Sequence, residues 1–349
     1  MNLKNGLKNV PGRQGCKVMA FSGTGIIIID HAATVHYACL VMKRIRKGIK
    51  RGVKRISYPF TAGIIMLAGR LIRKISRERA EKTAFIIGDL VYGVLRIRRG
   101  LVEKNLSHAF PEKNLQEIRE IARQSYRNQV LNFVEMLRIP LIRCKQDAEK
   151  IVEIKADESM LERIVHQKGA LMVSAHLGSW EIIGVCTGML LAPVNLIVKP
   201  VKNMRLDMYL NKLRTMHGNK VIPKNKALRQ GLKVLNQGEL LGVLGDQSNK
   251  DGDFYVDFLG RKATIFLGPA FWSLKAKVPL FVETCKRLEN GRYLIEISEI
   301  PTHDLSYNRE DIKTLALRYT KALEDFIRKN PEEWLWLHDR WKRTPDLPN

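Results

Sequence analysis

The sequence predicts an α/β fold in which a largely parallel central sheet is flanked by helices, with a further helical region on the N-terminal side. After residue 165, short apolar runs alternate with helical segments, and before it apolar residues recur at helical spacing. The chain has 349 residues, which is enough to bury a core without a metal or disulfide. Hydrophobic residues make up 45% of it, which excludes wholesale disorder.

The first third of the chain is strongly basic. Residues 1–104 hold 22 of the Lys and Arg residues and 5 of the Asp and Glu residues, in a chain whose net charge is +25. Basic clusters at 43–55, 70–79 and 96–99 alternate with apolar pieces. Nucleic acid and an anionic membrane surface are the two partners that suit this layout.

Two apolar pieces in this region favour the membrane. Residues 58–69 and 84–95 are each about a dozen residues long and flanked by arginines, whereas a bilayer span needs about 20. They fit interfacial helices with basic residues at the headgroups, so we expect an N-terminal membrane-docking helical region. An amphipathic pair packed on a soluble core is the alternative. Nucleic acid is disfavoured because no zinc finger, ribonucleoprotein motif or heptad run accompanies the charge.

The extreme N-terminus carries fewer signals. Residues 20–42 are long enough to span a membrane, but Asp30, His31 and His36 interrupt them, and the segment lacks the pattern of a signal peptide. Met42 opens a basic stretch followed by apolar sequence, and a true start there is a separate hypothesis. We divide the chain into a basic extension (1–56), membrane-associating helices (57–104) and an α/β domain (105–349).

One long amphipathic helix is expected after residue 111. Its apolar residues follow three- and four-residue steps, and Pro111 and Pro140 bracket it. These residues are Leu115, Ile118, Ile121, Ala122, Tyr126, Val130, Phe133 and Leu137.

The second half reads as βαβ units. Buried strands are expected at 170–176, 194–200, 219–223 and 239–246, with helices near 179–190, 203–216 and 226–237 between them. This order predicts a largely parallel sheet, whose ligands bind at the carboxyl ends of the strands.

The segment "SAHLGSWE" follows the first of these strands. His176 leaves the strand, Ser179 is placed to cap the next helix, and Glu181 falls in its first turn. The His-x4-Glu interval lets the carboxylate fold back onto one imidazole nitrogen, which would leave the other to take a proton from a hydroxyl. Ser179 as a nucleophile is disfavoured because the segment is not a G-x-S-x-G elbow.

The cysteines give no sign of a metal or disulfide framework. They are widely and unevenly spaced with no CxxC pair, and no metal-ligand spacing appears in the chain. They are Cys16, Cys39, Cys144, Cys186 and Cys285.

Several segments, in this order, resemble the bacterial lipid A biosynthesis acyltransferases, the lauroyl/myristoyl-transferring branch of the lysophospholipid acyltransferase superfamily. The similarity covers residues 58–345. Its pieces are "NLSHAFPEK" (105–113), "SAHLGSWE" (174–181), "VKPVKNMRLD" (198–207), "GVLGDQ" (242–247), "DFLGRKATIFLGPA" (257–270) and "PEEWLWLHDRWK" (331–342).

The resemblance implies transfer of an acyl chain from an acyl carrier protein to a hydroxyl of a lipid A precursor. It places the active site on the cytosolic side of the bacterial inner membrane, with no bound cofactor and no metal. His176 would be the general base and Glu181 its partner, where the glycerolipid branch has Asp. Arg214, about thirty positions on, would bind a phosphate or stabilise the oxyanion, with an exposed helix arginine as the alternative.

Further substrate contacts are expected at five positions. Asp246, at a strand end, would orient a sugar hydroxyl or cap a helix, and Arg261 would meet a phosphate. The other three are Lys199, Asn203 and Gln247. An aromatic and basic C-terminal helix that packs and anchors at the interface is expected to hold Trp334, Trp336, His338, Arg340 and Trp341.

Three other functions stay open at this stage. The first is an acyltransferase acting on lysophosphatidic acid or another lysolipid. The second is a membrane-associated scaffold without catalysis, and the third is a nucleic-acid-binding module.

A strongly acidic acyl carrier protein, a phosphorylated acceptor and an anionic bilayer would all be attracted by the same basic surface.

Overall fold

The computed structural model describes residues 17–22, 25–30, 58–166, 169–247 and 254–342. It divides into two compact units, with the boundary between Gly63 and Ile64. In the first unit, β1 (Lys17–Ser22) and β2 (Gly25–Asp30) pair as an antiparallel hairpin. Residues 31–57 lie outside the described residues. They include the basic cluster at 43–55 and the proposed start at Met42.

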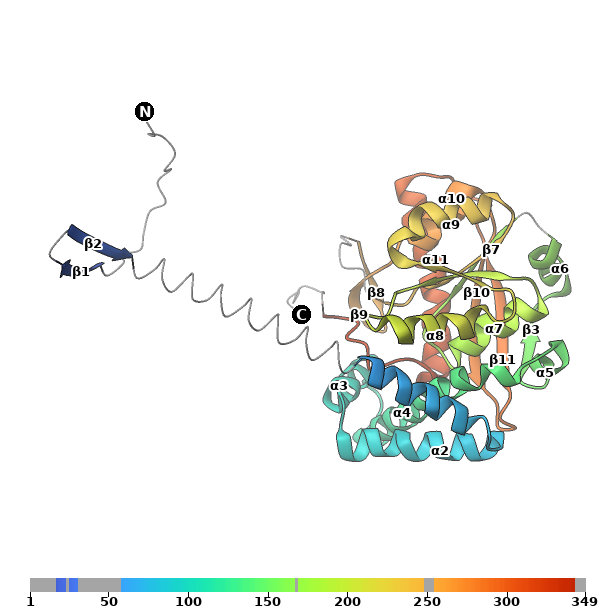
Figure 1. The fold of residues 1–349 in the computed structure, drawn as a ribbon. Coiled ribbons are helices and arrows are strands. Elements are labelled where there is room, and N and C mark those ends of the chain that lie inside the picture. Colours follow the sequence, from blue (N-terminus) through green and yellow to red (C-terminus); the bar gives the residue numbers. More distant parts are fainter. Residues whose placement is uncertain (1–16, 23–24, 31–57, 167–168, 248–253, 343–349) are drawn as a thin grey trace. The chain divides into compact units, whose positions relative to one another are not determined.

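The second unit is built on a seven-stranded mixed sheet (Figure 1). Its strand order is β3-β11-β10-β4-β7-β5-β6, and its neighbours are parallel except for the antiparallel pair β10 and β11. The strands are β3 (Val152–Lys155), β4 (Ala170–Ser174), β5 (Val194–Val198), β6 (Lys220–Pro223), β7 (Leu240–Leu244), β10 (Leu280–Arg287) and β11 (Tyr293–Ile300).

Helices follow the parallel strands, as the alternating pattern predicts. α7 (Trp180–Leu190) follows β4, α8 (Met204–Thr215) follows β5, and α9 (Ala227–Asn236) follows β6. The expected strands and helices of this half are therefore confirmed. The remaining helices of the half are α5 (Lys145–Glu149), α6 (Glu158–His166), α10 (Gly268–Ala276) and α11 (Arg309–Lys329).

The sheet has a hydrophobic core on each face, which the alternation along β4 illustrates. Leu171 and Val173 join a cluster with residues of α9, α10 and α11, whereas Ala170 and Met172 join a cluster with residues of α7 and α8. Successive side chains of a strand point to opposite faces, so a strand covered on both faces is buried along its whole length. This explains why β4 is fully buried.

The predicted long helix is α4 (Leu115–Arg138). It begins at a capping box, in which the Asn114 side chain accepts from the backbone N–H of Glu117 and the Glu117 carboxylate accepts from that of Asn114. Pro140 falls in the short 3₁₀ turn η2 (Ile139–Leu141) that ends the helix. The local signals at both ends of this element are thus sufficient to place it.

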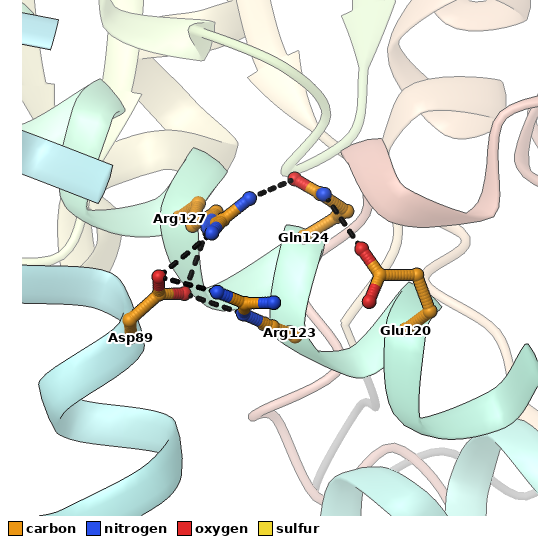
Figure 2. Close-up of polar contacts among 5 residues, drawn as sticks. All are labelled: Asp89, Glu120, Arg123, Gln124 and Arg127. Atoms are coloured by element: carbon orange, nitrogen blue, oxygen red, sulfur yellow. Dashed lines mark hydrogen bonds and ion pairs between the residues drawn. The ribbon is translucent and has the colours of Figure 1, made fainter. Parts of the chain in front are cut away.

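Two further helices pack against α4 in the same unit. α2 (Arg77–Leu90) continues into the π-helical turn η1 (Val91–Leu95), and α3 (Arg99–Ala109) follows. The Asp89 carboxylate accepts two hydrogen bonds each from Arg123 and Arg127, at 2.7–2.8 Å, and Figure 2 shows both guanidinium groups directed at it.

The domain boundary at residue 104 stays a prediction.

Large apolar side chains are exposed on the N-terminal helices. They lie on the helical residues 58–72 and on α2 and η1, where the docking region is expected. Within the described part of the chain, no helix combines the length and the apolar character that crossing a bilayer requires. The exposed residues are Phe60, Ile64, Met66, Leu67, Leu71, Ile86, Ile87, Leu90, Val94 and Leu95.

The expectation of a C-terminal helix is wrong. After α11 the chain makes one 3₁₀ turn, η4 (Pro331–Glu333), and residues 334–342 are irregular. Trp334, Trp336 and Trp341 are buried. The Trp334 ring makes edge-on contacts with Trp336, Trp341 and Phe258 of β8 (Tyr255–Phe258), and Trp341 also lies against Phe258. Packing of three large rings in the core fixes this segment without helical hydrogen bonds, and these rings do not face an interface.

Candidate active site

A cleft of about 460 Å³ lies at the carboxyl-terminal side of the central strands, within the size range of small-molecule sites. Its walls come from β4, β5 and β7 and from the helices that cover them. Its apolar lining includes Met172, Ile183, Val194, Leu196, Val198, Ala227, Leu228, Leu244, Phe266 and Trp272, and its polar lining is Ser174, His176, Glu181, Thr187, Lys199, Arg214, Lys224, Gln247 and Glu283.

The turn from β4 into α7 places His176 at this cleft. Gly178 has φ +49°, and a Cβ there would stand 2.8 Å from the carbonyl oxygen of Cys285, so the turn requires glycine. Ser179 occupies the N-cap position of α7, as expected, but its hydroxyl donates to Asn132 at 3.3 Å instead of capping the helix. The glycine therefore sets how close this turn lies to β10.

Asp246 is the carboxylate that holds His176. Its Oδ1 lies 2.8 Å from Nδ1 of His176, while its Oδ2 accepts from the His176 backbone N–H at 3.2 Å and from the Trp334 indole N–H at 2.8 Å. Burial alone would raise the pKa of Asp246, but the charge and hydrogen bonds of His176 and the Trp334 bond lower it to about 2. Asp246 is therefore ionised at neutral pH and accepts from Nδ1–H.

His176 and Gln247 line the cleft together. With Nδ1 protonated, Nε2 carries a lone pair, and the Gln247 amide nitrogen lies 3.2 Å from it. The Trp180 ring packs edge-on against the imidazole at 5.1 Å between centroids. A hydroxyl that replaced the Gln247 amide at Nε2 would find a base oriented from behind by a carboxylate.

Glu181 has a different partner from the one expected. Its carboxylate accepts from Arg214 Nε at 2.9 Å and from Nη2 at 2.5 Å, and both side chains are largely buried in the cleft wall. The hydrogen bonds found for the His176 ring go to Asp246 and Gln247. The expected contact between His176 and Glu181 is therefore replaced by two separate pairs.

The sheet register explains this exchange of partners. Ser174 of β4 pairs with Leu244 of β7, and His176 and Asp246 each follow two residues later. Parallel neighbours end at the same edge of a sheet, so the two side chains meet there. Glu181 instead lies in the first turn of α7, which packs against α8, where Arg214 is in the last turn.

The other predicted contacts divide into two groups. Lys199, Arg214 and Gln247 line the cleft with His176. Asn203 and Arg261 are not among its lining residues: Asn203 caps α8 by accepting from the Leu206 N–H at 3.3 Å, and the Arg261 guanidinium lies over the Trp341 ring at 5.6 Å.

Arg261 begins β9 (Arg261–Thr264), which pairs with β8 across a two-residue turn. Both turn residues, Leu259 and Gly260, have positive φ, as a type I′ hairpin turn requires. Arg261 is thus placed directly after a tight hairpin turn, and its contact with a phosphate stays a prediction.

Several residues of the site were missed in the sequence, among them the polar lining residues Ser174, Thr187 and Lys224. Two others bear on the chemistry. Trp334 supports Asp246 from the C-terminal segment, and Glu283 lines the cleft from β10. A glutamate in the middle of an apolar strand, "LFVETCKR", was an available signal for the second. Nothing local marks Trp334, because its contact depends on a chain separation of 88 residues.

No group of three or more His, Cys, Asp or Glu side chains is arranged to hold a metal ion among the residues that the structure describes.

Comparison with known proteins now decides the family. The family model described as bacterial lipid A biosynthesis acyltransferase matches residues 49–343, which is most of the chain. The chain belongs to this family, and it is an acyltransferase. Its resemblance to lipid A acyltransferases, first seen in short segments, is confirmed across the whole α/β unit.

Three curated relatives agree with this assignment. The chain is 23% identical over 262 residues to the lipid A biosynthesis palmitoleoyltransferase of Escherichia coli (strain K12) and, equally, to a lipid A biosynthesis acyltransferase of Shigella flexneri. It is also 23% identical over 262 residues to the lipid A biosynthesis lauroyltransferase of E. coli (strain K12). Each match covers 74% of this chain and 83–84% of the relative. The two E. coli relatives are named for different acyl groups, palmitoleoyl and lauroyl.

Proposed function

We propose that this acyltransferase moves a fatty acyl chain from the thioester of an acyl carrier protein to a hydroxyl of a lipid A precursor, with His176 as general base. The observation that carries the proposal is the position of His176: its Nδ1 is held by the buried Asp246, and its ring lines the apolar cleft. A base of this kind needs no protein nucleophile and no bound cofactor.

The reaction begins when the acceptor hydroxyl gives its proton to Nε2 of His176. The hydroxyl oxygen forms a bond to the thioester carbonyl carbon, and the carbonyl oxygen becomes the oxyanion of a tetrahedral intermediate. The intermediate collapses by breaking the carbon–sulfur bond, and the departing thiolate takes the proton from Nε2. Throughout, Asp246 stabilises the imidazolium through Nδ1–H.

We assign Glu181 and Arg214 a positioning role. Each side chain already satisfies the other through two hydrogen bonds, and the Arg214 Nη1 donates to Asn211 at 3.1 Å. The pair crosslinks α7 to α8 at the cleft wall, which fixes the first turn of α7 behind His176. Lys199 is exposed at the end of β5 and lines the same cleft, so we assign it to a phosphate or to the oxyanion.

The proposal places the reaction at the cytosolic face of the bacterial inner membrane. Within the second unit, exposed apolar side chains on residues 64–72, α2 and η1 lie among arginines in the sequence, as an interfacial surface requires. An anionic bilayer and an acidic acyl carrier protein would both be attracted to a chain of net charge +25.

An acyl transfer assay tests the proposal. Purified protein is incubated with acyl carrier protein thioesters of several chain lengths and either a tetra-acylated lipid A precursor or lysophosphatidic acid. Products are read by mass spectrometry. We expect the precursor to gain the mass of one acyl group, and His176→Ala to lose about 10²- to 10⁴-fold in rate. His303→Ala, on the loop before α11, is the matched control and should leave the rate unchanged.

Each contrary outcome has a defined meaning. Gain of mass on the lysolipid alone would move the acceptor to the glycerolipid class. Full activity of His176→Ala would remove the proposed base, and transfer to neither acceptor would contradict the proposed reaction.

A further inference from the structure

A carboxyl group that the proposed chemistry does not use lies in the cleft wall. Glu283 is on β10, between the buried residues Val282 and Thr284, and is itself 5% exposed. It nevertheless lines the cleft that contains His176. An acidic side chain at a fully buried strand position is rare unless it is paired, so this position calls for a partner.

The protein supplies only part of that pairing. The Thr187 hydroxyl of α7 donates to Oε1 of Glu283, and this is the single hydrogen bond found for the carboxyl among the described residues. Ser174 and Thr187 also line the cleft, so the three side chains form one polar patch. The remaining oxygen, Oε2, has capacity for a bond that a ligand in the cleft can complete.

The protonation state of Glu283 is compatible with a hydrogen bond to an uncharged ligand group such as a hydroxyl. Burial raises the pKa of Glu283 to about 7, against a smaller opposite effect of the Thr187 bond. A carboxylic acid that is substantially neutral at physiological pH carries one O–H donor as well as acceptor oxygens. Such a group pairs with a hydroxyl without the cost of burying a charge.

The register of the sheet shows where along the cleft the patch lies. Val282 of β10 pairs with Val173 of β4, so Glu283 follows at the level of Ser174. His176 comes two residues later in the chain, which corresponds to about 7 Å of extended backbone. A chain whose thioester carbon lies at His176 would therefore pass the patch close to its reacting end.

We propose that Glu283 selects a donor acyl chain that carries a hydroxyl group near its thioester end. This inference rests on the proposed function and specifies the substrate class of that same site. Beyond the patch the cleft is lined by aliphatic side chains of Met172, Ile183 and Leu196, which suit the rest of the chain. A plain saturated chain would leave Oε2 without a hydrogen-bond partner inside the filled cleft, which is unfavourable. A hydroxylated chain satisfies it.

A competition assay tests this. Equal amounts of dodecanoyl and 3-hydroxydodecanoyl acyl carrier protein are supplied with one acceptor, and the two products are resolved by their difference in mass. We expect the wild type to favour the hydroxylated donor. Glu283→Met, an apolar replacement of similar size, should shift the product ratio toward the plain chain by about 10- to 100-fold. Glu283→Gln keeps a donor and an acceptor and should give a smaller shift.

Two controls make the assay specific. Glu324→Gln changes another buried carboxyl, on α11, where it pairs with Arg328 outside the cleft lining, and should leave the ratio unchanged. Thermal unfolding of each variant shows that it is folded. A ratio that differs from wild type by less than twofold in Glu283→Met overturns the inference, as does a preference that follows hydroxyls on the acceptor.

A binding measurement separates this inference from the proposed function. Isothermal titration calorimetry with the pantetheine thioesters of dodecanoic and 3-hydroxydodecanoic acid measures the donor preference in the absence of an acceptor. Preferential binding of the hydroxylated thioester that Glu283→Met abolishes would support the inference even if no acceptor were acylated. Equal binding of both thioesters by the wild type would overturn it even in an active enzyme.

Discussion

Asp246 holds His176 through hydrogen bonds that also determine how an asparagine side chain would be oriented at position 246. Its Oδ2 accepts two N–H donors, from the His176 backbone and from Trp334. An asparagine would have to present its oxygen to those donors and therefore turn its NH₂ toward Nδ1. The imidazole would then carry its proton on Nε2, where the acceptor hydroxyl needs a base.

We therefore expect Asp246→Asn to lower kcat by about 10²- to 10⁴-fold while the fold is retained. The measurement is steady-state acyl transfer across pH 6 to 9, with thermal unfolding as the check on folding. Asp304→Asn removes an exposed carboxylate that pairs with Arg318 and serves as the control. Retention of kcat within threefold would contradict the assignment of Asp246 as the residue that orients the base.

Glu283 makes folding stability depend on pH in a direction that can be worked out. Burial raises its pKa from 4.5 to about 7, so between these values the native state binds a proton that the unfolded state has lost. Stability then falls as pH rises through this window, by at most about 1.4 kcal/mol per pH unit for one group.

Glu283→Gln should remove this contribution. Its unfolding free energy relative to the wild type is expected to increase from pH 5 to pH 7.5, as measured by urea unfolding at each pH. Because only the difference between the two proteins is used, the other titrating groups cancel to a first approximation. A difference that stays constant over this range would show that Glu283 does not titrate as described.

Among the elements, α2 and α4 are joined by a charged contact at a close approach of their backbones. Asp89 accepts four hydrogen bonds from Arg123 and Arg127, whose guanidinium groups hold the pKa of this carboxyl well below its usual range. A Cβ on Gly88 would lie 2.7 Å from the Arg127 Cα, so the neighbouring residue is small by necessity.

Asp89→Asn should destabilise the protein by about 1–3 kcal/mol, because it leaves two adjacent guanidinium groups without their carboxylate. The advantage of the wild type is present above the unfolded-state pKa of 3.8 and diminishes as pH falls below it, since the native carboxylate resists protonation. Urea unfolding at pH 7 and pH 3 measures both effects.

Glu78→Gln is the matched control for this measurement. It removes an exposed pair with Lys82 on α2, and we expect a much smaller change in the unfolding free energy than for Asp89→Asn. Equal effects of the two substitutions would mean that the Asp89 contact contributes no more than a surface ion pair.

The elements that were predicted from the sequence are those with local signals. The apolar run at 170–174 places β4, and the apolar spacing between Pro111 and Pro140 places α4, without reference to the rest of the chain. The partnership of His176 with Asp246 depends on β4 lying beside β7, and strand order is not encoded within either strand. The His-x4-Glu spacing favoured Glu181 as the partner of His176, because a sequence interval shows only which side chains nearby in the chain can contact the imidazole.

The irregular segment 334–342 was mispredicted for a related reason. Its aromatic and basic composition is compatible with an amphipathic helix, and the choice between helix and irregular chain is made by tertiary packing. Trp334 and Trp336 are each at most 1% exposed, and their burial outweighs the helical preference of the segment.

For the molecule as a whole, the uneven distribution of charge and exposed apolar residues predicts how it meets a membrane. The first 104 residues carry most of the excess positive charge, and α2 and η1 expose aliphatic side chains. Ile86 is 70% and Val94 71% exposed, which in a soluble setting would be unfavourable at both positions. Charge would bring the protein to an anionic surface, and the aliphatic residues would hold it there.

We expect the purified protein to cosediment with vesicles containing anionic lipid and to bind purely zwitterionic vesicles more weakly. Replacing both Ile86 and Val94 by Asn should lower the affinity for anionic vesicles by roughly 30- to 1,000-fold, because each aliphatic side chain contributes about 1–2 kcal/mol when it leaves water. Raising the salt concentration should weaken the electrostatic contribution and leave the apolar one.

Leu317→Asn, at an exposed leucine of α11, provides the control for a general loss of apolar surface. If it weakened vesicle binding as much as the double variant, the interfacial surface would not be confined to the N-terminal helices. If neither variant altered binding and high salt abolished it, attachment would be purely electrostatic, and the exposed aliphatic residues of α2 and η1 would need another explanation.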